Sequence, residues 1–168
     1  MSGSHLYAPW RMEYIAGISK SEGCFICEAV AAKSQEEKRQ RLILWESESS
    51  IILINRYPYT NGHLLIAPKA HKADLEDLSD GEQLDLQTQT IAAIKLLKKA
   101  MSPQGFNLGI NLGRCAGAGL PGHIHQHVVP RWGGDTNFMT AVGEVRVVPE
   151  AMSHLWNELM KARGEMSL

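Results

Sequence analysis

The sequence has no excess of charge of either sign, since 17 Lys and Arg residues stand against 18 Asp and Glu residues and give a formal net charge of −1. Proteins that bind long polyanions are usually basic, so this balance argues against a nucleic-acid partner. No apolar run approaches the roughly 20 residues of a membrane span, and the N-terminus lacks the basic and apolar regions of a signal peptide. We therefore expect no nucleic-acid partner and no membrane attachment.

Cysteine is scarce, with three residues in the chain, and two of them form the motif Cys24-x-x-Cys27. This number excludes a dense disulfide framework and fits the reducing cytoplasm, where we expect the protein to reside. A redox Cys-x-x-Cys motif needs a thioredoxin-like βαβ context, which is missing here. If the motif instead binds zinc, it supplies two of the four ligands that a structural site requires.

The chain has 168 residues, of which 44% are apolar and 21% are charged, and it contains no internal repeat. These values are typical of one soluble domain, which we expect to span residues 1–168. Residues 1–20 form an N-terminal arm, whose segment 7–15 is apolar enough to pack. The charged run 31–41 is expected to be a solvated helix or loop.

Hydrophobic patterning predicts five strands and two main helices. The strands are expected at residues 42–46, 51–54, 63–67 and 105–112, with the fifth beginning at His123. Because the strands come in consecutive runs with one long helical interruption, we predict an α+β domain with a mostly antiparallel sheet.

The long helix is predicted to begin after Ser79, because Ser79 and Glu82 have the spacing of a capping box, and to end near Met101. A stripe at helical spacing is expected to face the core or a subunit interface; it contains Leu84, Ile91, Ile94, Leu97 and Met101. A C-terminal helix is predicted from Pro149 to about residue 162.

Three of the seven histidines lie within five residues, at His123, His125 and His127. On a strand this alternation places all three imidazoles on one face, about 6.6 Å apart, since each residue rises about 3.3 Å. Ile124 and Val128 would then point to the core. Such a row can supply a nucleophile and proton donors for attack on phosphorus, or it can chelate a catalytic zinc.

The segment before the histidines is a glycine-rich loop, residues 113–122, with four glycines. Glycines allow backbone N–H groups to approach phosphate oxygens without a side-chain clash. The loop lacks the Gly-Lys-Ser/Thr sequence of a P-loop, so the motif alone is not specific.

The residues His-Ile-His-Gln-His-Val-Val at 123–129 resemble the motif of the histidine-triad (HIT) superfamily of nucleotide hydrolases and transferases. The likeness extends to residues 53–68 and 130–138, whose sequences are similar to the branch that contains diadenosine tetraphosphate phosphorylases and related dinucleoside-polyphosphate enzymes. In total it covers residues 8–160. It implies a HIT-like fold and, by inheritance from the family, a homodimer.

The resemblance also assigns roles within the region 105–138. His125 matches the nucleophile, which would form a nucleotidyl-imidazole intermediate at the α-phosphorus of a nucleoside polyphosphate. His127 would bond the phosphate or leaving-group oxygens and share in proton transfer. His123 would orient the row or bind zinc.

Substrate contacts follow from the same resemblance. Asn55 matches the residue that bonds the ribose hydroxyls, and His63 matches a fourth family histidine near the triad. Asn111 would bond a phosphate oxygen or simply end a strand, while Gly117 and Gly119 belong to the phosphate loop. No organic cofactor is expected.

His71 and His123 match zinc ligands in the Cys-containing members of the superfamily. Within the region 24–71, a structural zinc would therefore be held by Cys24, Cys27 and His71, with His123 as the fourth ligand. The alternative is a pair of reduced cysteines beside a surface histidine.

Three hypotheses for function remain open at this stage: a nucleotidyl enzyme with a histidine nucleophile, a zinc hydrolase with a three-histidine metal site, and a nucleotide-binding partner protein with little turnover. The third histidine disfavours the galactose-1-phosphate uridylyltransferase branch, which has glutamine there. Fragile-histidine-type hydrolases carry a loop glutamine where this chain has Ala118 and Gly119. The choice between water and phosphate as acceptor therefore stays open.

Overall fold

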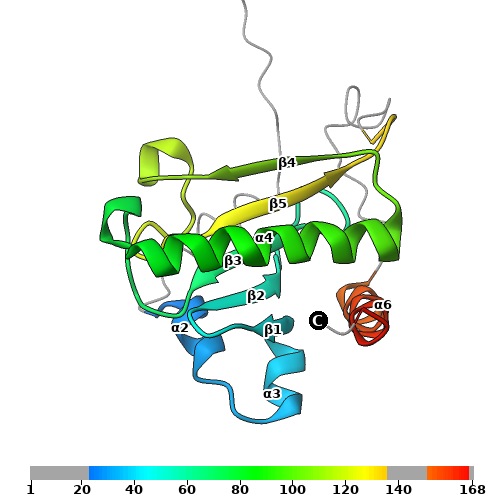
Figure 1. The fold of residues 1–168 in the computed structure, drawn as a ribbon, viewed down its shortest axis with the longest axis horizontal. Helices are drawn as coiled ribbons and strands as arrows, with labels where there is room; N and C mark the ends of the chain where they lie inside the picture. Colours follow the sequence, from blue (N-terminus) through cyan, green and yellow to red (C-terminus); the bar gives the residue numbers. More distant parts are fainter. Residues whose placement is uncertain (1–22, 136–150, 167–168) are drawn as a thin grey trace, which may run out of the picture.

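The structure is a computed structural model that describes residues 23–135 and 151–166 (Figure 1). The expected N-terminal arm, residues 136–138 of the catalytic region and the expected helix opening at Pro149 lie outside the described residues. The described elements, in chain order, are α2 (Phe25–Val30), α3 (Gln35–Gln40), β1 (Ile43–Glu46), β2 (Ser50–Ile54), β3 (Leu64–Pro68), the 3₁₀ turn η1 (Leu75–Asp77), α4 (Asp80–Met101), β4 (Gly105–Ile110), the 3₁₀ turn η2 (Arg114–Ala116), β5 (Gln126–Arg131) and α6 (Met152–Gly164).

The five strands form one sheet in the order β1-β2-β3-β5-β4, and every neighbouring pair is antiparallel. This confirms the predicted α+β class, the antiparallel sheet, the long helix and the C-terminal helix. Strand β5, which follows the histidines, lies in the interior of the sheet between β3 and β4. An interior strand is hydrogen-bonded along both edges, so the end of the histidine motif is built on a rigid element.

The long helix α4 begins as its sequence predicts. Ser79 Oγ accepts a hydrogen bond from the backbone N–H of Glu82, and a Glu82 carboxylate oxygen accepts one from the Ser79 N–H at 2.8 Å. Lys72 Nζ also donates to that carboxylate at 2.6 Å, and together these donors lower the pKa of Glu82 to about 2. Ser102 adopts a left-handed conformation at the other end, directly before Pro103, and the helix stops there. Among the described residues, no helix is both long and apolar enough to cross a bilayer.

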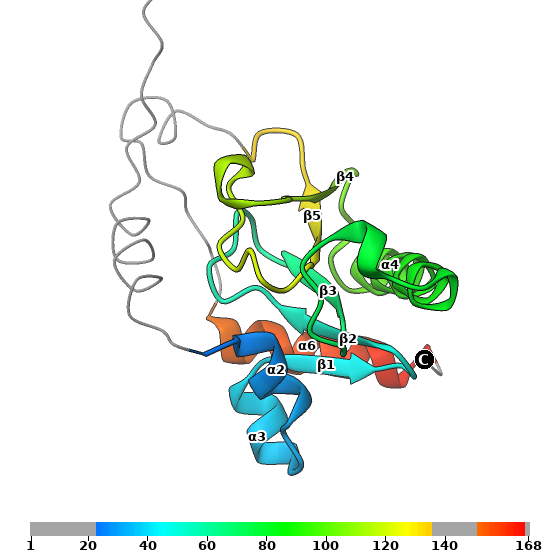
Figure 2. The same cartoon turned by 90° about the vertical axis from the view of Figure 1, so that its left-hand side faces the viewer.

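The sheet separates two apolar clusters. Helices α4 and α6 cover one face, where Ile52, Ile66 and Val128 are buried. Helix α2 covers the other face, where Ile51 and Leu65 are buried, and the two views in Figures 1 and 2 show the helices on opposite sides. Side chains alternate along each strand, so the pairing of any residue assigns it to one of these faces.

The sequence stripe predicted on α4 is only partly buried. Leu97 is fully buried, but Leu84 and Ile91 are 71% and 55% exposed. The core is instead contacted by a different row of the helix, which contains Leu86, Thr90, Ala93, Leu96 and Leu97. Leu84 and Ile91 lie two turns apart on a second apolar face that points away from the sheet.

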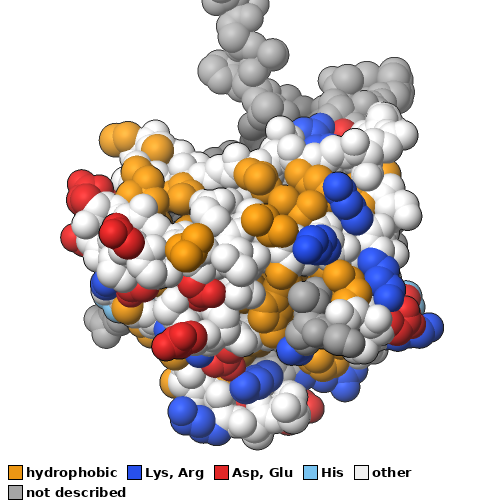
Figure 3. All heavy atoms as spheres, in the orientation of Figure 1, with side chains coloured by type: hydrophobic (Ala, Val, Ile, Leu, Met, Phe, Trp, Pro, Cys, Tyr) orange, Lys and Arg blue, Asp and Glu red, His pale blue; other side chains and the backbone are white. Residues whose placement is uncertain are grey.

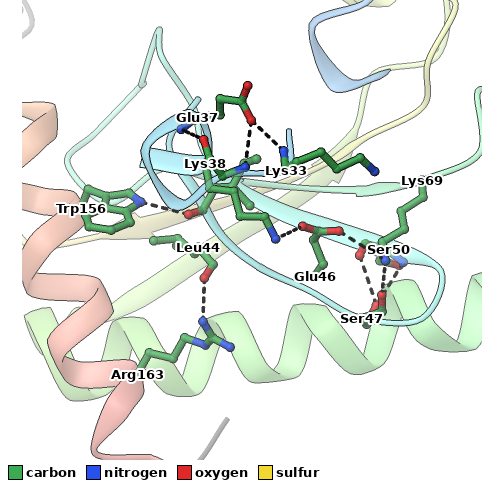
Figure 4. Close-up of polar contacts among 12 residues, drawn as sticks. Lys33, Glu37, Lys38, Leu44, Glu46, Ser47, Ser50, Lys69, Trp156 and Arg163 are labelled. Carbon is green, nitrogen blue, oxygen red and sulfur yellow. Dashed lines mark hydrogen bonds and ion pairs between the residues drawn. The ribbon is translucent and has the colours of Figure 1, made fainter. Parts of the chain in front are cut away.

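Helix α6 covers the β1 edge of the sheet. Trp156 Nε1 donates to the carbonyl of Ile43, and Arg163 Nη1 donates to the carbonyl of Leu44, each at 2.9 Å (Figure 4). Side-chain donors therefore use backbone groups that an added strand could otherwise bind. The opposite edge, β4, has no partner strand among the described residues.

Candidate active site and metal centre

The three motif histidines are not all on a strand. Strand β5 begins at Gln126, so His123 and His125 lie in the irregular segment that leads into it, and only His127 is a strand residue. The expected strand thus starts three residues late. Ile124 and Val128 are buried as predicted. His123 and His125 are buried as well, at 0% and 6% exposed.

The strand register assigns His127 to the α2 face of the sheet. His127 pairs with Leu65, which belongs to the apolar cluster under α2, and His63 lies two residues before Leu65. Gln126 pairs with Ile66 and points to the α4 face, where its side-chain oxygen accepts a hydrogen bond from Gln87 at 3.2 Å. The side chain of His127, a candidate catalytic residue, is therefore on the side of the sheet opposite the long helix.

His125 is oriented by the backbone of its own motif. Its Nδ1 atom lies 2.8 Å from the carbonyl oxygen of His123. A carbonyl can only accept, so Nδ1 carries the proton and Nε2 keeps its lone pair. Burial lowers the pKa of His125, which favours the neutral imidazole. The neutral ring therefore has the lone pair that a nucleophile needs, and its centroid lies 5.1 Å from that of His127.

A chain of hydrogen bonds sets the tautomer of His127. The backbone N–H of Tyr59 donates to His63 Nδ1 at 3.0 Å, so the proton of a neutral His63 is on Nε2. That Nε2 lies 3.0 Å from His127 Nδ1, to which it donates. His127 therefore carries its own proton on Nε2.

The Nε2 atom of His127 is buried and has no hydrogen-bond partner among residues 23–135 and 151–166. Burial, followed by the neighbouring His125, lowers the pKa of His127 to about 4, so the ring is neutral at physiological pH. A buried donor without a partner is costly, and such groups recur at functional sites. The geometry provides a lone pair on His125 beside an N–H on His127, the pair that an in-line displacement at phosphorus requires.

Asn55 lies beside the same network. Its Nδ2 is 3.3 and 3.5 Å from the two ring nitrogens of His63, and its Oδ1 accepts a hydrogen bond from the N–H of Tyr57 at 3.0 Å. The Tyr59 ring stacks on His127, with centroids 5.9 Å apart. The loop between β2 and β3 therefore lines the site on the side of His127.

The glycine-rich loop folds as an irregular turn around η2. Gly113 and Gly117 have φ values of +75° and +90°, in the region that favours glycine. Asn111 donates a long hydrogen bond of 3.5 Å to the carbonyl of Gly117, so it braces the loop from within, and Gly119 lies half-buried further along the loop.

A second cluster lies on the other side of His123. The Nδ1 atom of His123 is 3.2 Å from Cys24 Sγ and 3.6 Å from Cys27 Sγ, and His71 Nδ1 is 3.2 Å from Cys27 Sγ. The Nε2 atom of His123 lies 2.8 Å from the carbonyl oxygen of Pro68. This Nε2 therefore donates, and His123 Nδ1 directs its lone pair at the thiols. All four residues predicted as metal ligands therefore meet, and their ligand atoms lie within 4.8 Å of one another.

This donor set fits a tetrahedral zinc. Zn–S and Zn–N bonds of about 2.3 and 2.05 Å imply S···N separations of about 3.5 Å, close to those in the cluster. Pro68 provides the carbonyl acceptor that a metal-bound imidazole usually has for its other N–H. Burial and then Cys24 raise the pKa of the Cys27 thiol, whereas a redox-active cysteine has a lowered one.

The three-histidine zinc site does not fit the geometry. His123 directs one ring nitrogen at the thiols and the other at Pro68, and His125 directs Nδ1 at a backbone carbonyl. Three imidazoles that chelate one ion would need one nitrogen each at a common point. Among the described residues, His123 instead lies in the candidate metal cluster, and His125 and His127 lie side by side as a candidate catalytic pair.

Two residues of the site carried no motif to indicate their roles. Tyr59 contributes a backbone amide, which no side-chain pattern reveals. Phe25 lies between the two cysteines of the Cys24-x-x-Cys27 motif, and its ring lies 6.4 Å from that of His125, edge to face at 73°. A large apolar residue between two expected metal ligands was the available signal.

The comparisons with known proteins agree with this geometry. The family model of the HIT domain matches residues 35–134, and the chain belongs to the HIT family. It is 36% identical over 151 residues to an "AP-4-A phosphorylase" of Mycobacterium tuberculosis, covering 88% of this chain and 77% of the relative. It is also 32% identical over 89 residues to a fission-yeast (Schizosaccharomyces pombe) bis(5'-nucleosyl)-tetraphosphatase, covering 53% of this chain and 48% of that relative.

Among solved structures, a zinc-bound histidine triad family protein from Mycobacterium smegmatis superimposes with a TM-score of 0.67 at 26% identity, covering 86% of this chain and 96% of that one. The chain is therefore a HIT-family enzyme of the nucleotide hydrolase and transferase class.

Proposed function

We propose that the protein transfers a nucleotidyl group from a dinucleoside polyphosphate, such as diadenosine tetraphosphate, through a covalent intermediate on His125. The observation that carries the proposal is the pair of fixed tautomers: a lone pair on His125 Nε2 beside an N–H on His127 Nε2. The likeness to a phosphorylase of diadenosine tetraphosphate supports this substrate class.

The first step forms a bond between His125 Nε2 and the α-phosphorus. The bond from phosphorus to the bridging oxygen breaks, and nucleoside triphosphate leaves when the substrate is a tetraphosphate. His127 donates an Nε2 N–H hydrogen bond to the leaving oxygen, and the triphosphate leaves as an anion that needs no proton. His125 keeps its Nδ1 proton on the carbonyl of His123, which stabilises the charge that develops on the ring.

In the second step an acceptor oxygen attacks the same phosphorus, and the P–N bond breaks. His127 keeps its Nε2 proton and hydrogen-bonds the phosphoryl oxygens, the electron pair of the P–N bond returns to His125 Nε2, and any proton that the acceptor loses passes to solvent. If the acceptor is inorganic phosphate the product is a nucleoside diphosphate; if it is water the product is a nucleoside monophosphate. We propose phosphate, because the relative that covers 88% of the chain is named as a phosphorylase.

Substrate contacts are proposed at the two loops that flank the imidazoles. Asn55, held beside His63, would bond the ribose hydroxyls. The loop containing Gly117 and Gly119 would offer backbone N–H groups to the phosphates, with Asn111 as its brace or as a further phosphate donor.

We also propose that Cys24, Cys27, His71 and His123 hold a structural zinc, which would supply cross-links between three segments and no step of the reaction. The ligand spacing supports this, as does the zinc-bound structural relative. Thiolate ligands suit the reducing cytoplasm that the sequence predicts. Metal analysis of protein purified without chelator should find about one zinc per chain.

Homodimerisation is proposed through β4 and α4. The exposed residues Leu84 and Ile91 of α4 lie on the same side of the sheet as Leu108 of β4, which is 49% exposed and pairs with the buried Val128. Hydrophobic side chains are exposed on the face of the molecule in Figure 3. An apolar patch beside an open strand edge suits a two-fold interface in which β4 pairs with its own copy.

The enzymatic proposal is tested by product analysis. Diadenosine tetraphosphate incubated with the protein and inorganic phosphate should yield ADP and ATP, and His125→Asn should yield neither. If AMP and ATP form at the same rate with or without phosphate, the acceptor is water. If the wild-type protein produces no nucleotide, the proposal fails.

A further inference from the structure

Phe25 links the metal cluster to the nucleophile. It lies between Cys24 and Cys27 in the sequence, at the first position of α2, and its side chain is 41% exposed. Its ring contacts the ring of His125 edge to face, with centroids 6.4 Å apart. This is an aromatic arrangement with a preferred geometry, so it restrains the orientation of the imidazole.

His123 provides a second connection to the same ring. Its imidazole belongs to the metal cluster through Nδ1, while its backbone carbonyl accepts the Nδ1 proton of His125 at 2.8 Å. Both groups that restrain His125 therefore belong to residues whose positions the metal cluster determines. One restrains the ring through its edge and the other through a hydrogen bond.

Few contacts fix the first turn of helix α2: the buried Ile26, the ion pair of Glu28 with Arg41 at 2.8 Å, and the cysteine cluster. The helix is six residues long, and its cap is the Cys24 sulfur, which accepts the N–H of Cys27 at 3.4 Å. Only Ile26 and Ala29 of the helix are buried. A helix this short is marginal by itself, so the cross-link to His71 and His123 should determine where Phe25 sits.

The geometry points to Phe25 as a positioning residue that, together with the His123 carbonyl, transmits the loading of the Cys24/Cys27/His71/His123 cluster to the orientation of the nucleophile His125. The metal then affects the rate of nucleotidyl transfer without touching the substrate. The kinetic part of this inference rests on the proposed function, whereas the orientation of His125 does not.

The first test observes His125 directly and requires no substrate. The Nδ1 proton of His125, buried and bonded to a carbonyl, should give a slowly exchanging resonance in ¹⁵N-labelled protein, assigned by its loss in His125→Asn. Removing zinc with a chelator should broaden or abolish it. An unchanged resonance in zinc-free protein that remains folded would overturn the inference.

The second test keeps the metal and changes Phe25. Phe25→Ala should retain one zinc per chain, weaken the His125 resonance and slow nucleotidylation by diadenosine tetraphosphate about tenfold, with KM changed less than about twofold. Leu75→Ala, which truncates a residue that is 37% exposed in η1, is the matched control and should leave all readouts unchanged.

The outcomes separate the possibilities. A raised KM with an unchanged rate in Phe25→Ala would make Phe25 a substrate contact and overturn the positioning role. An unchanged resonance in Phe25→Ala would also overturn it. Absence of any adduct in zinc-loaded wild type would defeat the proposed function, while the resonance would still decide whether the cluster orients His125.

Discussion

The Nε2 atom of His63 lies 3.0 Å from the Nδ1 atom of His127, and both rings are held beneath the loop that contains Tyr59. His63 is fully buried, and because its Nδ1 accepts from the Tyr59 N–H, its Nε2 N–H donates to His127. The contact fixes which nitrogen of His127 can serve the leaving group. A residue outside the triad motif thus determines the protonation of one inside it.

We expect His63→Leu to lower kcat about 100-fold with little change in KM, because His127 loses the donor that selects its tautomer. His63→Gln should retain part of the activity, since an amide N–H can still donate to Nδ1. Steady-state kinetics on both variants test this. Equal losses in the two variants would show that packing, not the hydrogen bond, is what matters.

The lowered pKa of His127 predicts a dependence of stability on pH. The pKa falls from 6.5 to about 4 on folding, so between these values the unfolded chain binds more protons than the folded protein. The contribution of His127 to the free energy of unfolding should therefore rise with pH through this window. That contribution is lost as the pH falls from about 6.5 to about 4.

Urea denaturation at several pH values measures this slope, and His127→Gln is the control, because it removes the titrating group. The variant should show a shallower slope than the wild type over the same window. An identical slope in both proteins would mean that His127 is not the group responsible.

The exposed face of α4 predicts a dimer that charge can disrupt. Leu84→Glu combined with Ile91→Glu should convert the wild-type dimer to a folded monomer, since like charges would meet across a two-fold interface. Light scattering after size exclusion gives the mass. Leu75→Glu, on an exposed apolar residue outside α4 and β4, should leave the dimer intact. A wild-type monomer would refute this interface.

Sequence patterning was sufficient to predict most of the elements. The capping box at Ser79, the first four strands and the C-terminal helix lie close to where propensity and periodicity place them, whereas β5 begins three residues late and helix α2 was not predicted. The packing of α4 could not be predicted in the same way. Two apolar rows run along the helix, and the pattern does not say which one faces the sheet, because that depends on where β2, β3 and β5 lie in space.

The site residues were found largely through the motif, but not their arrangement. Alternation predicted one continuous strand face, whereas His123 and His125 precede β5, and the His123 ring belongs to the metal cluster. The Tyr59 amide and the Phe25 ring are contacts between segments far apart in the sequence. Such contacts follow only from the fold.

The central claim is that His125 Nε2 attacks phosphorus, and intact-protein mass spectrometry on rapidly quenched mixtures with diadenosine tetraphosphate tests it most directly. The account predicts that wild-type protein gains the mass of one nucleotidyl group, which is a nucleoside monophosphate less one water. Added phosphate should discharge the adduct as ADP, and His125→Asn should gain nothing. An adduct of equal amount on His125→Asn, or turnover by that variant at the wild-type rate, would contradict the account.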